Sequence, residues 1–344
     1  MDTAKLRTTA LAMVADNKGL LAMDESTPTA NKRFAAAGIP QNEEARRAYR
    51  DLIVTTPGLG DFLNGAILVD ETIRQQTREG IPFAEALEQQ GIIPGIKVDS
   101  GAKAMPAHPG EKLAFGLDAL RERLAEYASL GARFAKWRAV ITIGDRIPSS
   151  SCIQANALLL ALYSALCQEA GIVPIVEPEV LMDGDHNLAR CSEVTQKTLH
   201  TVFDQLVAQR VVLEAMILKP NMVVPGQKSP HQASDEEIAD ATVQTLLRTV
   251  PPAVPGIAFL SGGQSGEEAC SRLSNMNSRY RSRLPWALTF SFARAIQQPA
   301  MDIWHGQDAN VPAAQKALLH RARCAHAARR GEYTPAMENS VEKQ

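Results

Sequence analysis

Short apolar segments of β character alternate with longer segments of helical period along the whole chain. Eight such β segments can be identified, and they are residues 20–24, 66–69, 92–98, 133–138, 172–177, 213–219, 257–261 and 286–290. One helical segment is well marked, because Ile238, Thr242 and Leu246 recur at helical spacing behind a Ser234 to Glu237 capping box. Strand, helix and strand in succession form a right-handed crossover onto a parallel sheet, and eight repeats close as a (β/α)8 barrel.

The chain is long enough for one large domain or two smaller ones. Its 344 residues, 45% of them apolar, suggest two domains at about 150 residues each, but a single barrel also reaches this size. A doubly wound open sheet is the second candidate, although no GxGxxG motif follows the first strand and no low-complexity linker divides the chain. We therefore predict the α/β class, with a single TIM barrel over residues 1–328, an amphipathic N-terminal helix, and a flexible C-terminal tail over 329–344 that lacks periodicity.

Charge and cysteine content narrow the possible partners and the compartment. The 36 basic and 38 acidic residues give a net charge of 36 − 38 = −2, so the chain has no excess of positive charge for binding nucleic acid or an anionic membrane. Five cysteines without a CxxC pair or a Cys/His cluster argue against a disulfide framework and a structural zinc site. The longest apolar run, residues 157–163, is far shorter than the roughly 20 residues that span a bilayer. These features predict a soluble, cytoplasmic protein.

Polar residues collect at the carboxyl ends of four predicted strands, where barrel active sites lie. Because side chains alternate with a period of two, three residues at the end of each strand share its inward face. The four sets are Ala22, Asp24 and Ser26; Phe134, Lys136 and Arg138; Ile175, Glu177 and Glu179; and Ala215, Ile217 and Lys219. One such charge is usually a solvated loop residue, but agreement among four strands favours an active site on the barrel axis.

Lys219 ends the apolar segment 213–219. A lysine on the inward side of such a strand loses hydration, which disfavours its charged form, and a neutral amine can attack a carbonyl to form a Schiff base. The other interpretation is a lysine whose side chain reaches the rim and pairs with Glu177 or Glu179. The chemistry of the residues alone leaves both open.

Two candidate phosphate sites flank this lysine. Gly262 and Gly263 follow the seventh strand, where glycines let backbone amides approach an anion, and Arg294 follows the eighth. The alternative is a glycine turn with an unrelated surface arginine. A second basic and hydroxyl set follows the first and third strands and comprises Ser26, Thr29, Lys32, Arg33 and Lys97. Two phosphate-sized sites on either side of a lysine suggest a bisphosphorylated sugar.

Six short motifs together resemble those of class I fructose-bisphosphate aldolase. They are DEST at 24–27, GIKVD at 95–99, FAKWR at 134–138, VEPE at 176–179, LKPNMV at 218–223 and SGGQS at 261–265. The resemblance runs in order from about Leu20 to Pro335, nearly the whole chain. It implies reversible cleavage of fructose 1,6-bisphosphate to dihydroxyacetone phosphate and glyceraldehyde 3-phosphate, in glycolysis and gluconeogenesis or the Calvin cycle, by a homotetramer without a metal or cofactor.

The resemblance also assigns roles to individual residues. Lys219 matches the Schiff-base lysine and Glu177 the general acid/base. The residues that match the surroundings of these two are Asp24, Lys136 and Glu179. Those that match the C1-phosphate site are Ser261, Gly262, Gly263 and Arg294; those that match the C6-phosphate region are Ser26, Thr29, Arg33 and Lys97; and Arg138 matches a rim arginine. Use of fructose 1-phosphate or sedoheptulose 1,7-bisphosphate stays open.

The sequence departs from the family pattern at three places. Ala293 precedes the phosphate arginine where a glycine is frequent, and Thr29 stands where a serine is common. Animal members end in a tyrosine that takes part in proton transfer, whereas this chain ends in glutamine and its last aromatic residue is Tyr333. We therefore expect water, or a carboxyl group in the site, to protonate the enamine.

Two alternatives belong to other classes. A metal-dependent aldolase needs histidine and carboxylate ligands, yet the seven histidines are scattered and only His186, with Asp183 and Asp185, resembles a cluster. A catalytically silent sugar-phosphate-binding barrel would not need Lys219 and Glu177 together. Fold analogy alone does not decide between them.

Overall fold

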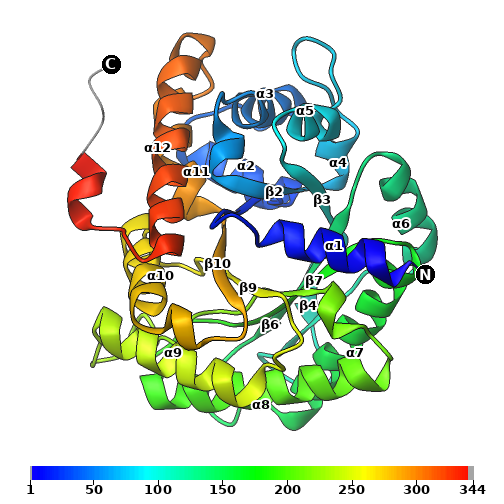
Figure 1. Cartoon of the computed structure of the whole chain (residues 1–344), viewed down its shortest axis with the longest axis vertical. Helices are drawn as coiled ribbons and strands as arrows, with labels where there is room; N and C mark the ends of the chain where they lie inside the picture. The colour runs from blue at the N-terminus through cyan, green and yellow to red at the C-terminus, as the bar shows by residue number, and fades with distance from the viewer. Residues whose placement is uncertain (1, 340–344) are drawn as a thin grey trace.

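Eight parallel strands close into a barrel in the computed structural model, which describes residues 2–339 (Figure 1). The strands follow one another around the barrel in the order β1, β10, β9, β8, β7, β6, β3 and β2. Their bounds are β1 Gly19–Ala22, β2 Leu63–Leu68, β3 Ile93–Lys97, β6 Phe134–Ile141, β7 Val173–Val180, β8 Ile217–Leu218, β9 Gly256–Phe259 and β10 Ala287–Phe292. Each expected β segment contributes one of these strands, and the predicted TIM barrel is confirmed.

The sixth barrel strand is much shorter than the sequence suggests. Residues Leu213–Ala215 form a 3-10 turn, and β8 keeps only two residues. The cause is Gln168, whose side-chain amide donates to the Val212 and Ala215 carbonyls at 2.8 and 3.1 Å. The same side chain accepts from the Val212 amide at 2.9 Å. These bonds occupy backbone groups that a longer strand would pair with its neighbours.

Helices between successive strands, and two more after the last strand, form the outer ring of the barrel. Their bounds are α2 Thr27–Ala36, α3 Glu43–Val54, α4 Asp70–Ile73, α5 Phe83–Gln89, α6 Leu120–Ser129, α7 Ser150–Glu169, α8 Leu188–Ala208, α9 Asp235–Thr249, α10 Gly266–Tyr280, α11 Arg294–Trp304 and α12 Val311–Arg330. The capping box predicted from Ser234 and Glu237 begins α9, and another from Ser265 and Glu268 begins α10. Both helices therefore start where the sequence places them.

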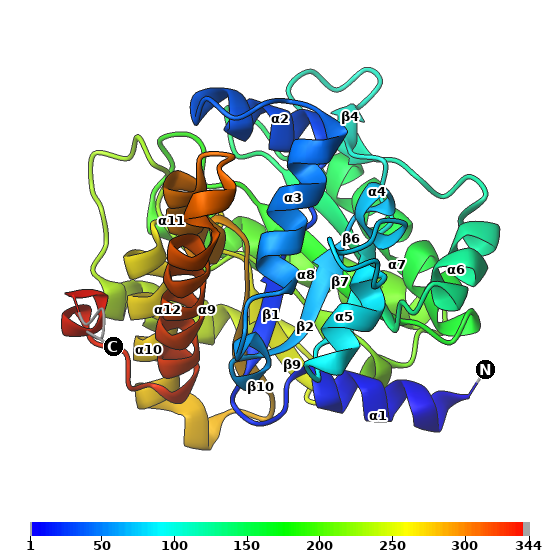
Figure 2. The ribbon, with the colours of Figure 1, turned by 90° about the horizontal axis from the view of Figure 1, so that it is seen from above.

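Helix α1, Thr3–Met13, closes the end of the barrel where the strands begin. Leu6, Ala10 and Met13 belong to the same apolar cluster as Leu20 and Phe134 of the barrel interior. Figure 2 shows α1 at one end of the barrel and α2 at the other. Because the amino end is filled with apolar side chains, solvent reaches the barrel axis from the carboxyl ends of the strands, which we call the barrel mouth.

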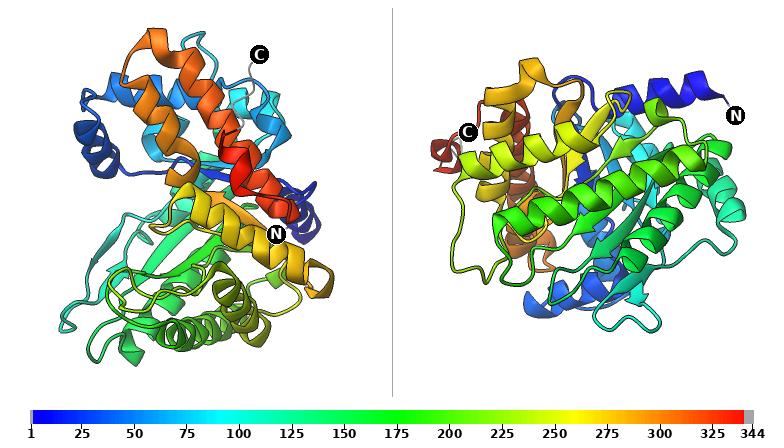
Figure 3. Two further views of the ribbon diagram at one scale, coloured as in Figure 1. Left: turned by 90° about the vertical axis from the view of Figure 1, so that its left-hand side faces the viewer. Right: turned by 90° about the horizontal axis from the view of Figure 1, so that it is seen from below.

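Helix α7 is, within residues 2–339, the one helix long and apolar enough to cross a membrane by length and composition alone. It packs beside α8 on the outside of the barrel (Figure 3). The Tyr163 hydroxyl on its inner face is fully buried and lies within hydrogen-bond distance of the Ala135 and Ile175 carbonyls, at 2.8 and 3.1 Å. Its apolar face is thus used in covering the barrel wall.

The C-terminal segment differs in part from the expected tail over 329–344. Helix α12 continues through Arg330, two residues beyond the expected boundary, and a 3-10 turn follows at Pro335–Asn339. Tyr333 is buried, and its hydroxyl donates to the Glu338 carboxylate at 2.7 Å. Glu338 also pairs with Arg321 of α12. Tyr333 and Glu338 therefore hold this segment against α10 and α12, and residues 340–344 of the expected tail lie outside the described residues.

Candidate active site

The inward faces of the strands carry apolar residues deep in the barrel and charged residues at the mouth. Leu20, Ala22, Phe134, Ile175 and Ile217 belong to one apolar cluster that fills the interior. One further step of two residues along β1, β6, β7 and β8 reaches Asp24, Lys136, Glu177 and Lys219. The two-residue period read from the sequence therefore matches the pleat of the strands.

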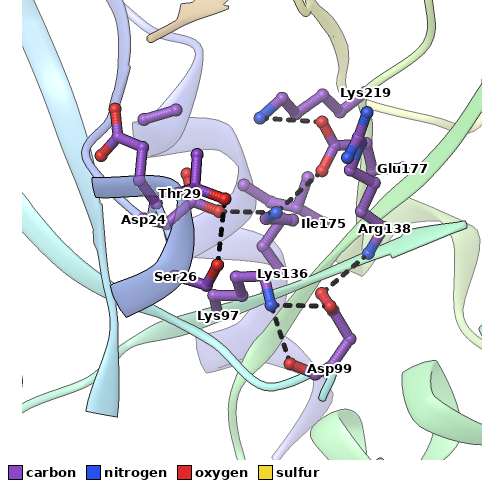
Figure 4. A network of polar contacts seen from close by, with 12 residues as sticks. Asp24, Ser26, Thr29, Lys97, Asp99, Lys136, Arg138, Ile175, Glu177 and Lys219 are labelled. Carbon is purple, nitrogen blue, oxygen red and sulfur yellow. Dashed lines mark hydrogen bonds and ion pairs between the residues drawn. The ribbon is translucent and has the colours of Figure 1, made fainter. Parts of the chain in front are cut away.

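Four charged side chains form one connected cluster at the barrel mouth (Figure 4). The Lys219 ammonium lies 3.1 Å from one oxygen of Glu177, and the Lys136 ammonium lies 3.0 Å from the other. Lys136 also lies 2.6 Å from the Asp24 carboxylate. All four side chains are at most 10% exposed. Lys219 is therefore buried and paired with Glu177 inside the barrel, and its side chain does not extend to the rim.

The charges of the cluster balance, with two lysines against two carboxylates. Burial alone would raise the pKa of Asp24, but the positive charges of Lys136 and Lys219 outweigh it and hold that pKa below its usual value. Burial would lower the pKa of Lys136, yet Asp24 and Glu177 raise it above its ordinary range. Lys136 is thus a fixed positive charge between two carboxylates.

Arg138 and Glu179 form a second ion pair, two residues further along β6 and β7 and nearer to the solvent. The Arg138 Nε donates to the Glu179 carboxylate at 2.5 Å, with the arginine side chain 41% exposed and the glutamate 7% exposed. Burial would lower the pKa of Arg138, but Glu179 and Glu177 raise it above its ordinary range. Arg138 therefore lies at the rim, where the resemblance places it.

The first candidate phosphate site lies between β9 and β10. Ser261, Gly262 and Arg294 line one cavity of about 840 Å³ at the barrel mouth. Gly262 has a φ of +62°, a conformation that favours glycine. Gly263 is placed differently from Gly262: a Cβ there would come 2.9 Å from the Gln227 amide nitrogen, and its own amide donates to the Ser261 carbonyl. Gly263 therefore supports the loop, while Gly262 faces the cavity.

The second candidate phosphate site lies beside β1 and β3. Ser26, Thr29, Arg33 and Lys97 all line the same cavity. The Ser26 and Thr29 hydroxyls are 3.1 Å apart at the beginning of α2. Lys97 is paired with Asp99 at 2.7 Å, and Arg33 with Glu25 at 2.5 Å. The fifth residue of this basic set, Lys32, is not among those lining the cavity.

The order of strands places Ser261 and Gly262 opposite Lys97 across the mouth, whereas Arg294 and the residues that follow β1 come after neighbouring strands. In the ring of eight, β9 is third and β3 is seventh, so four positions separate them. Ser261 and Gly262 follow β9, whereas Lys97 ends β3. The lysines of the charged cluster come from β6 and the end of β8, which stand between these two strands in the ring. An extended molecule with an anion at each end matches this layout.

Six polar residues that line the cavity had no role in the site predicted from the sequence. They are Glu25, Asp99, Ser100, Lys112, Asp183 and Ser291. Ser291 is 1% exposed, and its hydroxyl has no hydrogen-bond partner in the described part of the chain. Its position two residues before Ala293, on the inward face of β10, would have identified it by the same two-residue period. Lys112 lies on an unpredicted hairpin, and no sequence period signals it.

Histidines and cysteines do not gather at the barrel mouth. Across residues 2–339, the one group that could share a metal ion is His320, Cys324 and Glu338, on α12 and the segment after it. Its carboxylate is already engaged with Arg321 and Tyr333. His186 follows β7 and is 91% buried, with both ring nitrogens unpartnered in the described residues, but it forms no such group with Asp183 and Asp185.

Comparison with known proteins gives one consistent result. The family model described as class-I fructose-bisphosphate aldolase matches residues 5–344. A protein of Xanthomonas campestris named probable fructose-bisphosphate aldolase class 1 is 53% identical over 94% of this chain and 96% of its own length. Arabidopsis thaliana has a relative named fructose-bisphosphate aldolase 5, cytosolic, which is 49% identical over 95% of this chain and 90% of its own. A solved structure of the Plasmodium falciparum fructose-bisphosphate aldolase, in complex with TRAP and an inhibitor, superposes with a TM-score of 0.94 at 46% identity, covering 96% of this chain and 95% of that one.

Proposed function

The chain belongs to the class I fructose-bisphosphate aldolase family and is a fructose-bisphosphate aldolase, and on that premise we propose how its residues divide the reaction. The carbon–carbon bond between C3 and C4 of fructose 1,6-bisphosphate is cleaved reversibly through a lysine Schiff base. The observation that carries the assignment is the buried Lys219 ammonium 3.1 Å from the Glu177 carboxylate, on the axis of the barrel mouth.

Schiff-base formation begins with the amine of Lys219. Glu177 accepts a proton from the ammonium, and the free amine attacks the C2 carbonyl to form a carbinolamine. The same carboxyl then returns a proton to the C2 hydroxyl, which leaves as water and gives a protonated imine. Lys136 lies 3.0 Å from Glu177 and stays charged, so its positive charge attracts the carboxylate form of Glu177 before the first transfer and again after the second.

Bond cleavage uses the protonated imine as an electron sink. A carboxylate of the cluster, Glu177 or Asp24, removes the C4 hydroxyl proton. The electron pair of the C3–C4 bond then moves into the imine, which releases glyceraldehyde 3-phosphate and leaves an enamine on Lys219. Protonation at C3 and hydrolysis release dihydroxyacetone phosphate. Water or a carboxyl group in the site is the proton donor, because Tyr333 is buried against Glu338 and is not among the residues lining the cavity.

The two phosphates bind in the two candidate phosphate sites. Ser261, Gly262 and Arg294 hold the C1 phosphate, and Gly263 fixes the loop that carries Ser261 and Gly262. Ser26, Thr29, Arg33 and Lys97 form the C6-phosphate region, in which α2 directs its first turn toward the anion. Arg138 at the rim contacts the sugar between them.

Assembly and compartment extend the proposal beyond the site. We infer a homotetramer in the cytoplasm, with sugar phosphates as the partners. A named cytosolic relative at 49% identity and five free cysteines, all buried, support a reducing compartment. Sedimentation velocity at micromolar concentration tests the assembly, because a monomer has a mass of 37.2 kDa and a tetramer four times that.

Borohydride reduction in the presence of dihydroxyacetone phosphate, followed by peptide mass mapping, tests the chemistry directly. We expect a stable adduct on Lys219, and none in Lys219→Ala or in Lys219→Arg, whose guanidinium cannot be deprotonated to attack. An adduct on Lys136 or Lys97 instead would refute the assignment. The reaction as written needs no metal, so activity should survive chelators; a strong loss with EDTA that a divalent ion restores would favour the metal-dependent class.

A further inference from the structure

Most of the cations that line the cavity are already neutralised by carboxylates. Seven basic residues line it: Arg33, Lys97, Lys112, Lys136, Arg138, Lys219 and Arg294. Five of them are in ion pairs with Glu25, Asp99, Asp24, Glu179 and Glu177. Lys112 and Arg294 have no ion pair with any residue from 2 to 339. The substrate carries two phosphates, and the cavity has two uncommitted cations.

Lys112 lies on a short hairpin that follows β3. Its strands are β4 Ala102–Ala104 and β5 Lys112–Ala114, with Ala104 opposite Lys112 and Lys103 opposite Leu113. Directly opposed residues share one face of a sheet, so Lys112 and Ala102 are on one side and Lys103 is on the other. Ala102 and Lys112 line the cavity, whereas the Lys103 ammonium lies 5.6 Å from the centre of the Phe115 ring. Figure 2 shows β4 at the same end of the barrel as α2.

The backbone of Lys112 is fixed to the barrel wall. Its carbonyl accepts from the Asn156 amide of α7 at 2.9 Å. The preceding residue, Glu111, is 4% exposed, and its carboxylate accepts a hydrogen bond from the Ser149 backbone amide at 2.7 Å. At the base of the hairpin, a Cβ on Gly116 would lie 2.9 Å from the Ser100 amide nitrogen. The hairpin therefore presents the flexible arm of Lys112 from a fixed point above the cavity.

The two cations first assigned to the C6-phosphate region are already engaged with carboxylates. Lys97 is paired with Asp99, and Arg33 is paired with Glu25, which also binds the buried Arg50 of α3. The hydroxyls of Ser26 and Thr29 are neutral donors. Lys112 enters the cavity from the loop after β3, the strand that carries Lys97. Among residues 2–339, it is therefore the cavity-lining cation beside Lys97 that no carboxylate pairs, and Arg294 after β10 is the other unpaired cation.

We propose that Lys112 binds the C6 phosphate and determines the preference of this enzyme for bisphosphates over fructose 1-phosphate. The inference rests on the proposed function and adds a residue to its C6-phosphate region. The lysine ammonium is a point charge with three hydrogen-bond donors on a flexible side chain. It can therefore follow a phosphate whose position differs between substrates of different length. Because Lys112 is exposed, its contribution is sensitive to ionic strength.

The test compares two lysines on opposite faces of the hairpin. Lys112→Met removes the charge and keeps most of the side-chain length, and Lys103→Met is the matched control. For Lys112→Met we expect kcat/KM for fructose 1,6-bisphosphate to fall about 10- to 100-fold, through KM, since a hydrogen bond between charged groups contributes on that order. For fructose 1-phosphate, which lacks the C6 phosphate, kcat/KM should stay within about twofold. Lys103→Met should change neither, and Lys112→Arg should recover most of the bisphosphate activity.

Two readouts separate a local role from general damage. In the wild type, KM for the bisphosphate should rise with salt more steeply than in Lys112→Met. Borohydride trapping of dihydroxyacetone phosphate should be equal in wild type and variant, because that product lacks the C6 phosphate. Equal losses on both substrates, no loss on either, or the same loss in Lys103→Met would overturn the proposal. Absence of trapping in the wild type would instead contradict the proposed function itself.

Discussion

Glu177 bridges the two lysines of the charged cluster, so Glu177→Gln tests the proposed acid/base role most directly. Its two oxygens lie 3.1 Å from Lys219 and 3.0 Å from Lys136. Glutamine keeps the shape of the side chain but cannot accept and return a proton. Loss of a positioned general acid/base slows proton transfer by about 10² to 10⁴, which corresponds to about 2.7 to 5.4 kcal/mol in activation free energy.

The same change leaves the cluster with two lysines and one carboxylate, Asp24. An uncompensated buried charge costs about 3 to 5 kcal/mol when one partner of a buried pair is removed, unless one ammonium releases its proton. We therefore expect a fall in the free energy of unfolding as well, of at most that size. A neutral amine on Lys219 remains a nucleophile, so addition to the carbonyl continues while dehydration of the carbinolamine becomes slow.

The assay is rapid-quench borohydride trapping with dihydroxyacetone phosphate, together with steady-state cleavage. In Glu177→Gln the adduct should form more than a hundredfold more slowly but reach the same final yield on Lys219. The dissociation constant of an unreactive hexitol bisphosphate should stay within about threefold. Glu179→Gln is the matched control, since Glu179 is on the same face of β7 and pairs with Arg138 instead of the lysines. A change in KM alone, or an equal slowing in Glu179→Gln, would refute the acid/base role.

Three further predictions follow from the same contacts. Arg294→Ala should raise KM for fructose 1,6-bisphosphate and for fructose 1-phosphate about 10- to 100-fold each, because both carry the C1 phosphate; steady-state kinetics on the two substrates checks it. The pKa of Asp24 in the folded protein is below its ordinary 3.8, so its contribution to stability is present at neutral pH and is lost as the pH falls below 3.8. In denaturant unfolding, the free energy of unfolding of Asp24→Asn should therefore fall less between pH 4 and pH 3 than that of the wild type. Deleting residues 337–344 should leave cleavage and exchange of the C3 proton of dihydroxyacetone phosphate with solvent within a few fold; a hundredfold drop in exchange would show that the tail donates the proton. That deletion should also lower the free energy of unfolding by about 1 to 3 kcal/mol, because the buried Arg321 loses its Glu338 partner.

Local patterns in the sequence predict the barrel and most of the charged cluster at its mouth. Alternation of β segments and helices dictates parallel strands, and the two-residue period of a strand fixes which side chains face inward. That is why Asp24, Lys136, Glu177 and Lys219 could be assigned to one axis before any distance was known. Both capping boxes were equally readable, because a cap depends only on residues three positions apart.

Which cations remain unpaired depends on the tertiary structure. Lys97, Lys112, Arg33 and Arg294 look alike in the sequence, yet Lys97 and Arg33 are neutralised by neighbouring carboxylates, and Lys112 reaches the cavity only through the hairpin. The short β8 likewise depends on Gln168, which lies 44 residues or more before the carbonyls that it binds. Ion pairs and long-range hydrogen bonds join residues distant along the chain, and local periodicity carries no information about which partners meet.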